Sequence, residues 1–374
     1  MTAHSFNDFQ FAEAFSTWEL QRGYPLIHVV YEKDHKQFRL TQKRYLNADT
    51  NSIDSSSWFI PLNFAHANNP DFDDTKVTQY FMLDTSEKII STENIEGFND
   101  TEWFVFNKQQ LGFYRVNYDF ENWHNLIKVL NSESYQQIHV LNRAQIVDDV
   151  MNFAIDGHLN FDVALGILMY LRHETDYLPW ASAVNYLDRL DYMLLGTEVH
   201  EMFHQMVGIL ISKMFIAHGM HEKAGENFLN KNARELAINW LCRSGNARCL
   251  RDTYVQLHTA MSEGKSIPKP LEISFLCNGI KGNGKIEHFL FFWRKMFDST
   301  DQAERLRIID GIACADDHDI IKTLLDTSVS WTSDVNYRLH ERLRIFNSVL
   351  TSSSIGIDST LNFLADNFME AEVM

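Results

Sequence analysis

The sequence predicts a small all-β sandwich followed by a large all-α irregular helical array. Two patterns of residues along the chain support this prediction. Short runs of β-branched and aromatic residues separated by polar turns occupy residues 18–118. After Tyr118, apolar residues recur at helical spacing, with short loops between the periodic runs. The 374 residues also exceed the usual size of a single core, so we expect a multi-domain chain.

The predicted strands are rich in aromatic residues. They comprise the runs LIHVVY, FRLTQKRY, WFIPLNF, VTQYFML and EWFVFN. Polar segments such as NADTNSIDSSS and ANNPDFDD separate them, and this spacing is typical of a small antiparallel sandwich.

The predicted helices follow one another closely. They include LNRAQIVDDVMNFAIDGHL, FDVALGILMYLRHE, SAVNYLDRLDYML and EVHEMFHQMVGILISKMF. The chain has only six prolines, and few lie inside these runs. Such a series indicates a bundle or a stacked array, and because no fixed period is visible we expect an irregular array.

Composition limits the partners of the chain. The formal charge is −17, with 33 Lys and Arg against 50 Asp and Glu, which disfavours binding to nucleic acid. No run of 18 apolar residues is present, so we expect no membrane span in this chain. The first residues also lack the basic start and apolar stretch of a signal peptide.

The four cysteines all lie in the second half of the chain. Two disulfides among them could form with any of three connectivities, and four reduced, buried thiols are equally compatible with the composition. Zinc binding by the thiols is disfavoured because no C-x-x-C pair occurs. The positions are Cys242, Cys249, Cys277 and Cys314.

One glycosylation sequon, Asn99–Asp100–Thr101, lies in a predicted polar loop of the sandwich. Together with paired cysteines, a glycosylated Asn99 would indicate a secretory or cell-surface origin.

Four segments resemble, in the same order, the carboxy-terminal region of zinc aminopeptidases of the aminopeptidase N or endoplasmic-reticulum aminopeptidase type. The resemblance covers roughly residues 10–370. Taken alone, each motif has a plain physical explanation; the Asp148–Asp149 pair, for example, could be a solvated helix edge. The segments are WELQRGYPLIHV from Trp18, GFYRVNYD from Gly112, LNRAQIVDDV from Leu141 and DYLPW from Asp176.

The resemblance implies domain boundaries for the chain and a position for the catalytic groups of the family. Residues 1–17 would be the end of the catalytic domain, residues 18–118 the sandwich, and residues 119–374 a helical domain that is truncated at its end. The zinc motif of the family precedes the first segment, so the resemblance implies no catalytic residue and no cofactor in this chain. It also implies disulfides that pair Cys242 with Cys249 and Cys277 with Cys314.

A competing pattern is the sequence His200–Glu201–Met202–Phe203–His204, which reads H-E-x-x-H on a predicted helix. Two imidazoles one turn apart, with a carboxylate that activates a zinc-bound water, are typical of metalloproteases. The same helix is also explained by packing, because its apolar residues form one stripe at helical spacing. These apolar residues are Val199, Phe203, Met206, Val207, Leu210 and Met214.

The family's spacing disfavours a metal at this motif. Its third ligand would fall on Lys223, and Glu222 is one residue short, which on a helix turns a side chain by roughly 100°. His200, Glu201, His204 and Glu222 therefore remain weak candidate ligands. Among other motifs, the glycine-rich segment 279–285 lacks phosphate-loop spacing and reads as an interhelical loop.

The favoured function is that of a non-catalytic carboxy-terminal portion of a zinc-dependent aminopeptidase, which contributes to enclosing and gating peptides. Its partners would be peptides and the catalytic domain, and by family it would be extracellular or on the cell surface. The alternatives are a stand-alone peptide-binding or interaction module, and an independent zinc hydrolase that uses the H-E-x-x-H motif.

Overall fold

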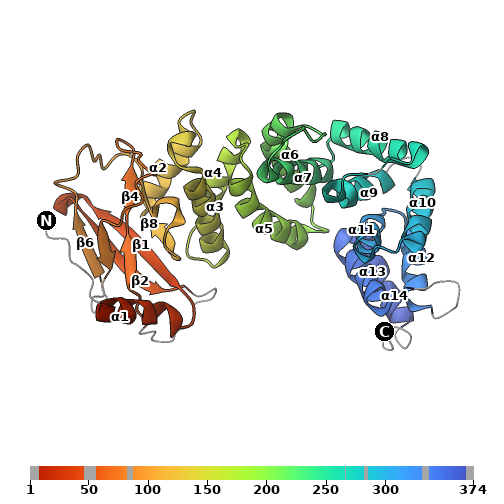
Figure 1. Cartoon of the computed structure of the whole chain (residues 1–374), viewed down its shortest axis with the longest axis horizontal. Coiled ribbons are helices and arrows are strands. Elements are labelled where there is room, and N and C mark those ends of the chain that lie inside the picture. Colours follow the sequence, from red (N-terminus) through yellow and green to blue (C-terminus); the bar gives the residue numbers. More distant parts are fainter. Residues whose placement is uncertain are drawn as a thin grey trace. The chain divides into compact units, whose positions relative to one another are not determined.

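The computed structural model describes residues 8–45, 56–81, 87–265, 267–281, 285–330 and 337–367. The chain divides into two compact units, Met1–Tyr186 and Leu187–Met374. The described strands all lie in the first unit, and helices follow them along the chain (Figure 1). The predicted fold class, a small β part followed by a large helical array, is confirmed.

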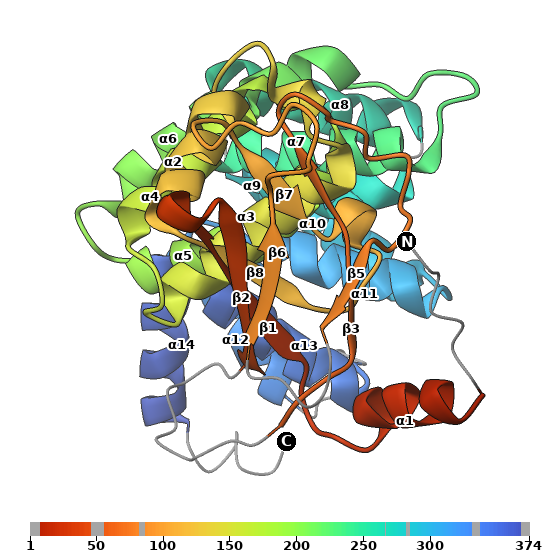
Figure 2. The ribbon, with the colours of Figure 1, turned by 90° about the vertical axis from the view of Figure 1, so that its left-hand side faces the viewer.

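A four-stranded sheet organises the β part, in the order β6 (Glu87–Ser91), β2 (Gln37–Arg44), β1 (Pro25–Glu32) and β8 (Arg115–Tyr118) (Figure 2). Strands β1 and β2 form an antiparallel hairpin in which Pro25 faces Arg44 and Glu32 faces Gln37. Strand β8 runs parallel to β1, which differs from the antiparallel sandwich that we expected. A parallel neighbour requires a long crossover, and here the other strands of the β part lie between β1 and β8 in sequence.

Two further strand pairs complete the β part. Strand β3 (Ile60–Leu62) pairs with β5 (Gln79–Phe81), and β4 (Phe64–His66) pairs with β7 (Phe104–Phe106), both antiparallel. The predicted run WFIPLNF thus contains all of β3 and the first residue of β4, Phe64. The helix α1 (Asp8–Glu19) and the strand β6 were not predicted.

Aromatic side chains fill the centre of the β part. Phe38 is fully buried, and the rings of four phenylalanines lie with their centroids 4.8–5.3 Å from its own. Most of these contacts are edge-to-face, the geometry that aromatic quadrupoles favour. The four are Phe64, Phe98, Phe104 and Phe106.

Three helices follow the sheet within the first unit: α2 (Phe120–Leu130), α3 (Val140–Ile155) and α4 (Phe161–Leu168). Asp119 caps α2, because its side chain accepts a hydrogen bond from the backbone N–H of Asn122. The next helix, α5 (Tyr177–Leu194), begins in the first unit and ends in the second.

The described residues of the second unit form helices joined by turns and loops, with no strand among them. Helices α6 (His200–His218) and α7 (Phe228–Arg243) pack closely, and a Cβ atom at Gly208 would lie 2.4 Å from Ser244 Oγ. The glycine therefore allows this close approach. The remaining helices are α8 (Ala247–Glu263), α9 (Glu272–Ile280), α10 (Lys285–Asp298), α11 (Gln302–Ile312), α12 (His318–Val329), α13 (Leu339–Ser352) and α14 (Ser354–Asp366).

Helices α8 to α14 of the second unit share one apolar core. Residues spaced three and four apart on each helix point into it, as the periodicity of the sequence predicts. In the described part of the chain, no helix is both long and apolar enough to cross a membrane. The fully buried core residues include Leu257, Leu276, Ile308, Ile312, Ile321 and Ile345.

Candidate metal site and motif network

Both histidines of the H-E-x-x-H sequence lie in the first turns of α6, on one side of the helix. Their rings are 4.3 Å apart between centroids. The Nε2 atoms of His200 and His204 each lie 2.6 Å from the same carboxylate oxygen, Oδ1 of Asp191. Asp191 belongs to α5, so a carboxylate from one helix meets two imidazoles from the next.

Asp191 is held in place by a third partner. Arg243, at the end of α7, places its Nη1 3.3 Å from Asp191 Oδ2 and 2.8 Å from Asp188 Oδ1. Burial would raise the pKa of the Asp191 carboxyl, but hydrogen bonds with His204 and His200 and the charge of Arg243 outweigh it and lower the pKa. The carboxylate therefore stays ionised under ordinary conditions.

The other sequence-predicted candidates do not join this cluster. Glu201 is exposed, and its Oε1 accepts a long hydrogen bond of 3.4 Å from Gln205. Glu222 forms an exposed ion pair with Lys231, at 3.2 Å. The carboxylate beside the histidines is thus Asp191, upstream of them in sequence, whereas the family's spacing had pointed downstream to Glu222 and Lys223.

The rest of α6 follows the predicted apolar stripe. Phe203, Val207, Leu210 and Met214 are buried, while Val199 is 48% exposed. The histidines lie at the margin of this stripe, and each retains about a fifth of its side-chain exposure. Partly exposed imidazoles beside a carboxylate can hold a cation that enters from solvent, and in the described residues these three side chains have donor atoms within 4.8 Å of one another.

A second polar cluster joins three of the motif segments. Arg115 of β8 lies beside the rings of Tyr24 and Tyr45, 5.8 and 5.0 Å from their centroids, and donates a hydrogen bond to Tyr24 Oη at 3.0 Å. It also pairs with Asp148 and, at 2.8 Å, with Asp149. Asp149 is buried, and so the simple explanation of the aspartate pair as a solvated helix edge fails for it.

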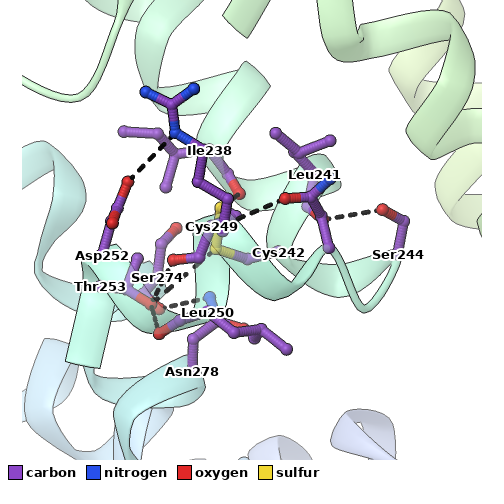
Figure 3. Close-up of a disulfide and its surroundings, with 12 residues drawn as sticks. Ile238, Leu241, Cys242, Ser244, Cys249, Leu250, Asp252, Thr253, Ser274 and Asn278 are labelled. Atoms are coloured by element: carbon purple, nitrogen blue, oxygen red, sulfur yellow. Dashed lines mark hydrogen bonds and ion pairs between the residues drawn. A yellow bond between two sulfur atoms is a disulfide. The ribbon is translucent and has the colours of Figure 1, made fainter.

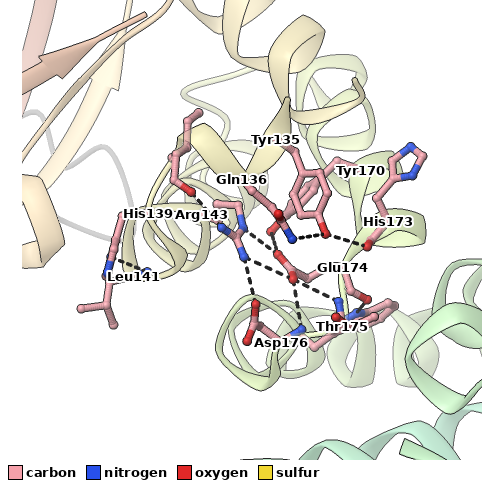
Figure 4. A network of polar contacts seen from close by, with 12 residues as sticks. Tyr135, Gln136, His139, Leu141, Arg143, Tyr170, His173, Glu174, Thr175 and Asp176 are labelled. Atoms are coloured by element: carbon pink, nitrogen blue, oxygen red, sulfur yellow. Dashed lines mark hydrogen bonds and ion pairs between the residues drawn. The ribbon is translucent and has the colours of Figure 1, made fainter. Parts of the chain in front are cut away.

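The remaining motif segment joins α3 through a buried ion pair (Figure 4). Arg143 donates from Nε to Glu174 Oε2 at 2.7 Å and from Nη2 to Asp176 Oδ2 at 3.1 Å. Glu174 is fully buried and also accepts the backbone N–H groups of Thr175 and Asp176, both at 3.0 Å. The segment that begins at Asp176 is therefore fixed to the first long helix of the array.

Comparison with known proteins decides the family. Residues 103–373, well over half of the sequence, match the model of the ERAP1-like C-terminal domain. The chain belongs to this family.

Similarity to individual relatives extends beyond the part that the ERAP1-like model matches. The chain is 30% identical to aminopeptidase N of Plutella xylostella and 29% identical to a membrane alanyl aminopeptidase of Manduca sexta, in both cases over 94% of its length. It is 26% identical to the human thyrotropin-releasing hormone-degrading ectoenzyme over 85% of its length. It covers 36%, 35% and 30% of these proteins, so it spans about a third of the length of its relatives.

The four cysteines of this ERAP1-like domain form two disulfides in the structure. Cys242 at the end of α7 joins Cys249 in the first turn of α8, and Cys277 of α9 joins Cys314 after α11. The Cα atoms are 5.1 and 5.0 Å apart, within the usual range for a disulfide. These are the pairs that the resemblance implied, and Figure 3 shows the first of them between its two helices.

The sequon lies on the surface of the ERAP1-like chain. Asn99 is exposed, and its Oδ1 accepts hydrogen bonds from the N–H and the hydroxyl of Thr101, at 3.1 and 2.9 Å. The side chain that would carry a glycan is therefore accessible.

The glycine-rich segment 279–285 begins inside α9, which ends at Ile280. Its residues 282–284 lie outside the described residues.

Sequence reasoning missed Asp191 and Glu174. Asp191 could have been found from its position, because it lies near the end of a predicted helix and only a short turn separates it from His200. Glu174 is the last residue of the predicted helical run FDVALGILMYLRHE, and nothing in the sequence there distinguishes a buried carboxylate from an exposed one.

Proposed function

We propose that this chain is the non-catalytic carboxy-terminal portion of a zinc-dependent aminopeptidase, which removes amino-terminal residues from peptides. The observation that carries the proposal is the family match over residues 103–373, together with relatives named as aminopeptidases over 94% of the chain. The zinc ion and the bond-breaking groups of the reaction would belong to the catalytic domain.

In this proposal the helical array encloses the peptide and gates its access. Enclosure excludes water and orients a substrate, so a packed array can raise turnover without providing a reacting group. Buried ion pairs such as Arg143–Glu174 and Arg305–Glu341 fix one segment to the next and support a stiff wall. The charge of −17 would favour the approach of the cationic amino terminus of a peptide.

The proposed location is the cell surface or the extracellular space. Two disulfides suit an oxidising compartment, and the names of the relatives include a membrane enzyme and an ectoenzyme.

The test mixes this chain with a separately purified catalytic domain of a matching aminopeptidase. We expect the two to bind, and the mixture to cleave peptides with a changed KM or kcat relative to the catalytic domain alone. The control replaces the chain with an unrelated globular protein of similar size and negative charge. The absence of both binding and any change in activity would refute the proposal.

A stand-alone peptide-binding module is the second candidate, favoured by a hollow of about 480 Å³ in the second unit. Apolar side chains of α6 and α8, Ile216 and Val255, line it beside the exposed Arg248 and Arg251, whose Nε atoms lie 3.6 and 3.9 Å from the carboxylate of Asp252, which also lines the hollow. This combination suits an apolar residue next to a peptide carboxylate.

The second candidate predicts binding of peptides without hydrolysis. A titration with a fluorescent peptide that has a free carboxylate should give saturable binding, which weakens when Arg248→Gln and Arg251→Gln are combined. Equal binding of the amidated peptide would show that the carboxylate is not recognised in this hollow.

A further inference from the structure

We propose that Asp191, His200 and His204 form a binding site for one divalent metal ion of the zinc class, which clamps the end of α5 to the start of α6. The proposal is independent of the proposed function, because it concerns residues of this chain alone. It also differs from a protease site, because the carboxylate comes from the preceding helix.

The residue types suit zinc. Imidazole nitrogen and carboxylate oxygen are common ligands of Zn²⁺, and three such ligands leave one position for water. His200 and His204 are four residues apart on a regular helix, so their imidazoles share one side of α6. One ring nitrogen of each histidine and a carboxylate oxygen of Asp191 all lie within 4.8 Å of one another.

The spacing requires only a small adjustment. Each Nε2 lies 2.6 Å from Asp191 Oδ1, a hydrogen-bond distance. Bonds of about 2.0–2.1 Å to a tetrahedral ion would place the ligand atoms roughly 3.3 Å apart. Each of these two distances would therefore open by less than about 1 Å, and side chains with 19–21% exposure have the freedom to do so.

The surroundings orient the carboxylate. Arg243 contacts Oδ2 of Asp191, which leaves Oδ1 directed at the two imidazoles. The guanidinium lies over the ring of Trp240, 4.5 Å from its centroid, and is also paired with Asp188. Such outer partners fix the geometry of metal ligands, and the charge of Asp188 offsets the repulsion between Arg243 and a bound cation.

The arrangement favours a structural over a hydrolytic role. A hydrolytic site would need a carboxylate positioned to activate the metal-bound water. Glu201, the residue that the H-E-x-x-H pattern offers, is exposed and contacts Gln205. The ion would instead link two consecutive helices, and all four cysteines are engaged in disulfides, so thiolates do not compete for it.

The test uses the full chain with its disulfides intact, stripped with a chelator and titrated with ZnCl₂ by calorimetry. We expect one ion per chain, and an affinity at least about tenfold weaker in His200→Gln/His204→Gln and in Asp191→Asn. The matched control is His35→Gln/His221→Gln, which removes two exposed histidines outside the cluster and should bind zinc as the original chain does.

Two further readouts keep the test decisive if a variant folds poorly. Zinc should raise the Tm of the original chain and of the control, but not that of the cluster variants. Bound Co²⁺ should give the visible spectrum of nitrogen and oxygen ligands in the original chain.

Three outcomes would overturn the proposal. They are no stoichiometric zinc in the original chain, equal binding by the cluster variants, and zinc-dependent peptide hydrolysis that is lost in Glu201→Gln, which would assign the motif to a hydrolase.

Discussion

The carboxylate of Glu341 holds two helices of the second unit together, α11 and α13. It is fully buried and pairs with Arg305 through two hydrogen bonds of 2.6 and 2.9 Å. It also accepts the backbone N–H of Arg338 at the start of α13. Burial would raise its pKa, but the hydrogen bonds from Arg305 and from the Arg338 backbone outweigh it and lower the pKa of Glu341 to about 2.

This low pKa predicts an acid-sensitive stability. The ordinary pKa of the group is 4.5, so the contribution of the ionised form is fully present above pH 4.5 and is lost as the pH falls towards 2. The loss would amount to at most about 3 kcal/mol. Urea unfolding between pH 5 and pH 2.5 should show it as a decrease that is smaller in Glu341→Gln than in the original chain, because other carboxylates such as Asp191 also lose their contribution over this range.

The same variant should be destabilised near neutral pH by about 3–5 kcal/mol, because it leaves the buried charge of Arg305 unpaired. The exposed Glu287 of α10 provides the control, and Glu287→Gln should change the free energy of unfolding by less than about 0.5 kcal/mol. Parallel pH profiles of the original chain and Glu341→Gln would contradict the assignment.

Asn99 leads to a prediction about modification. Its exposed side chain and the hydroxyl of Thr101 satisfy the sequon in a surface loop. When the chain is secreted from eukaryotic cells, we expect a glycan at this position, removable by an N-glycosidase. Both Asn99→Gln and Thr101→Ala should lack the mass shift, and its persistence in either variant would place the glycan elsewhere.

At the scale of elements, the two disulfides should differ in strength. They close loops with separations of 7 and 37 residues, and a longer loop gives the unfolded chain more entropy to lose. The entropic model gives about 2 kcal/mol for Cys242–Cys249 and about 4 kcal/mol for Cys277–Cys314. Replacing each pair by serines should lower the free energy of unfolding in this order, as urea titrations would show.

Mass spectrometry after alkylation provides the control for that comparison. In the native, unreduced chain none of the four cysteines should be labelled, because all are bonded. A larger loss on removing the Cys242–Cys249 pair would show that packing around these buried sulfurs outweighs the loop entropy.

Local sequence patterns predicted the helices and longer strands better than they predicted how the strands pair in the sheet. The apolar periodicity of the helices and the aromatic runs of the longer strands are local, so they were visible in the sequence. The parallel pairing of β8 with β1 depends on a contact between residues 26 and 115, which no local pattern encodes. The short β6 was missed because only Ile89 and Ile90 stand out in it.

The candidate site shows the same limit. The helical spacing of His200 and His204 identified two side chains correctly placed on one side of α6. The family's spacing places the third ligand downstream of them, at Lys223. The chain reverses direction after α5, and this places Asp191 next to the two histidines. The H-E-x-x-H pattern does not encode such a tertiary contact.

At the scale of the whole molecule, the two compact units contain separate cores and separate buried ion pairs. The aromatic cluster around Phe38 and the Arg143–Glu174 pair belong to Met1–Tyr186. The core of α8–α14 and the Arg305–Glu341 pair belong to Leu187–Met374. Loss of one ion pair should therefore destabilise mainly its own unit, because domains with their own cores unfold as separate cooperative units.

Hydrogen exchange measured by mass spectrometry tests this division, with each variant serving as the control for the other. Glu341→Gln should accelerate amide exchange in peptides from α10 to α13 and leave the sheet strands β1 and β2 unchanged. Glu174→Gln should accelerate exchange in α3 and the sheet, and leave α10 to α13 unchanged. Equal acceleration of both units by either variant would mean that the chain unfolds as one cooperative body, in spite of its two cores.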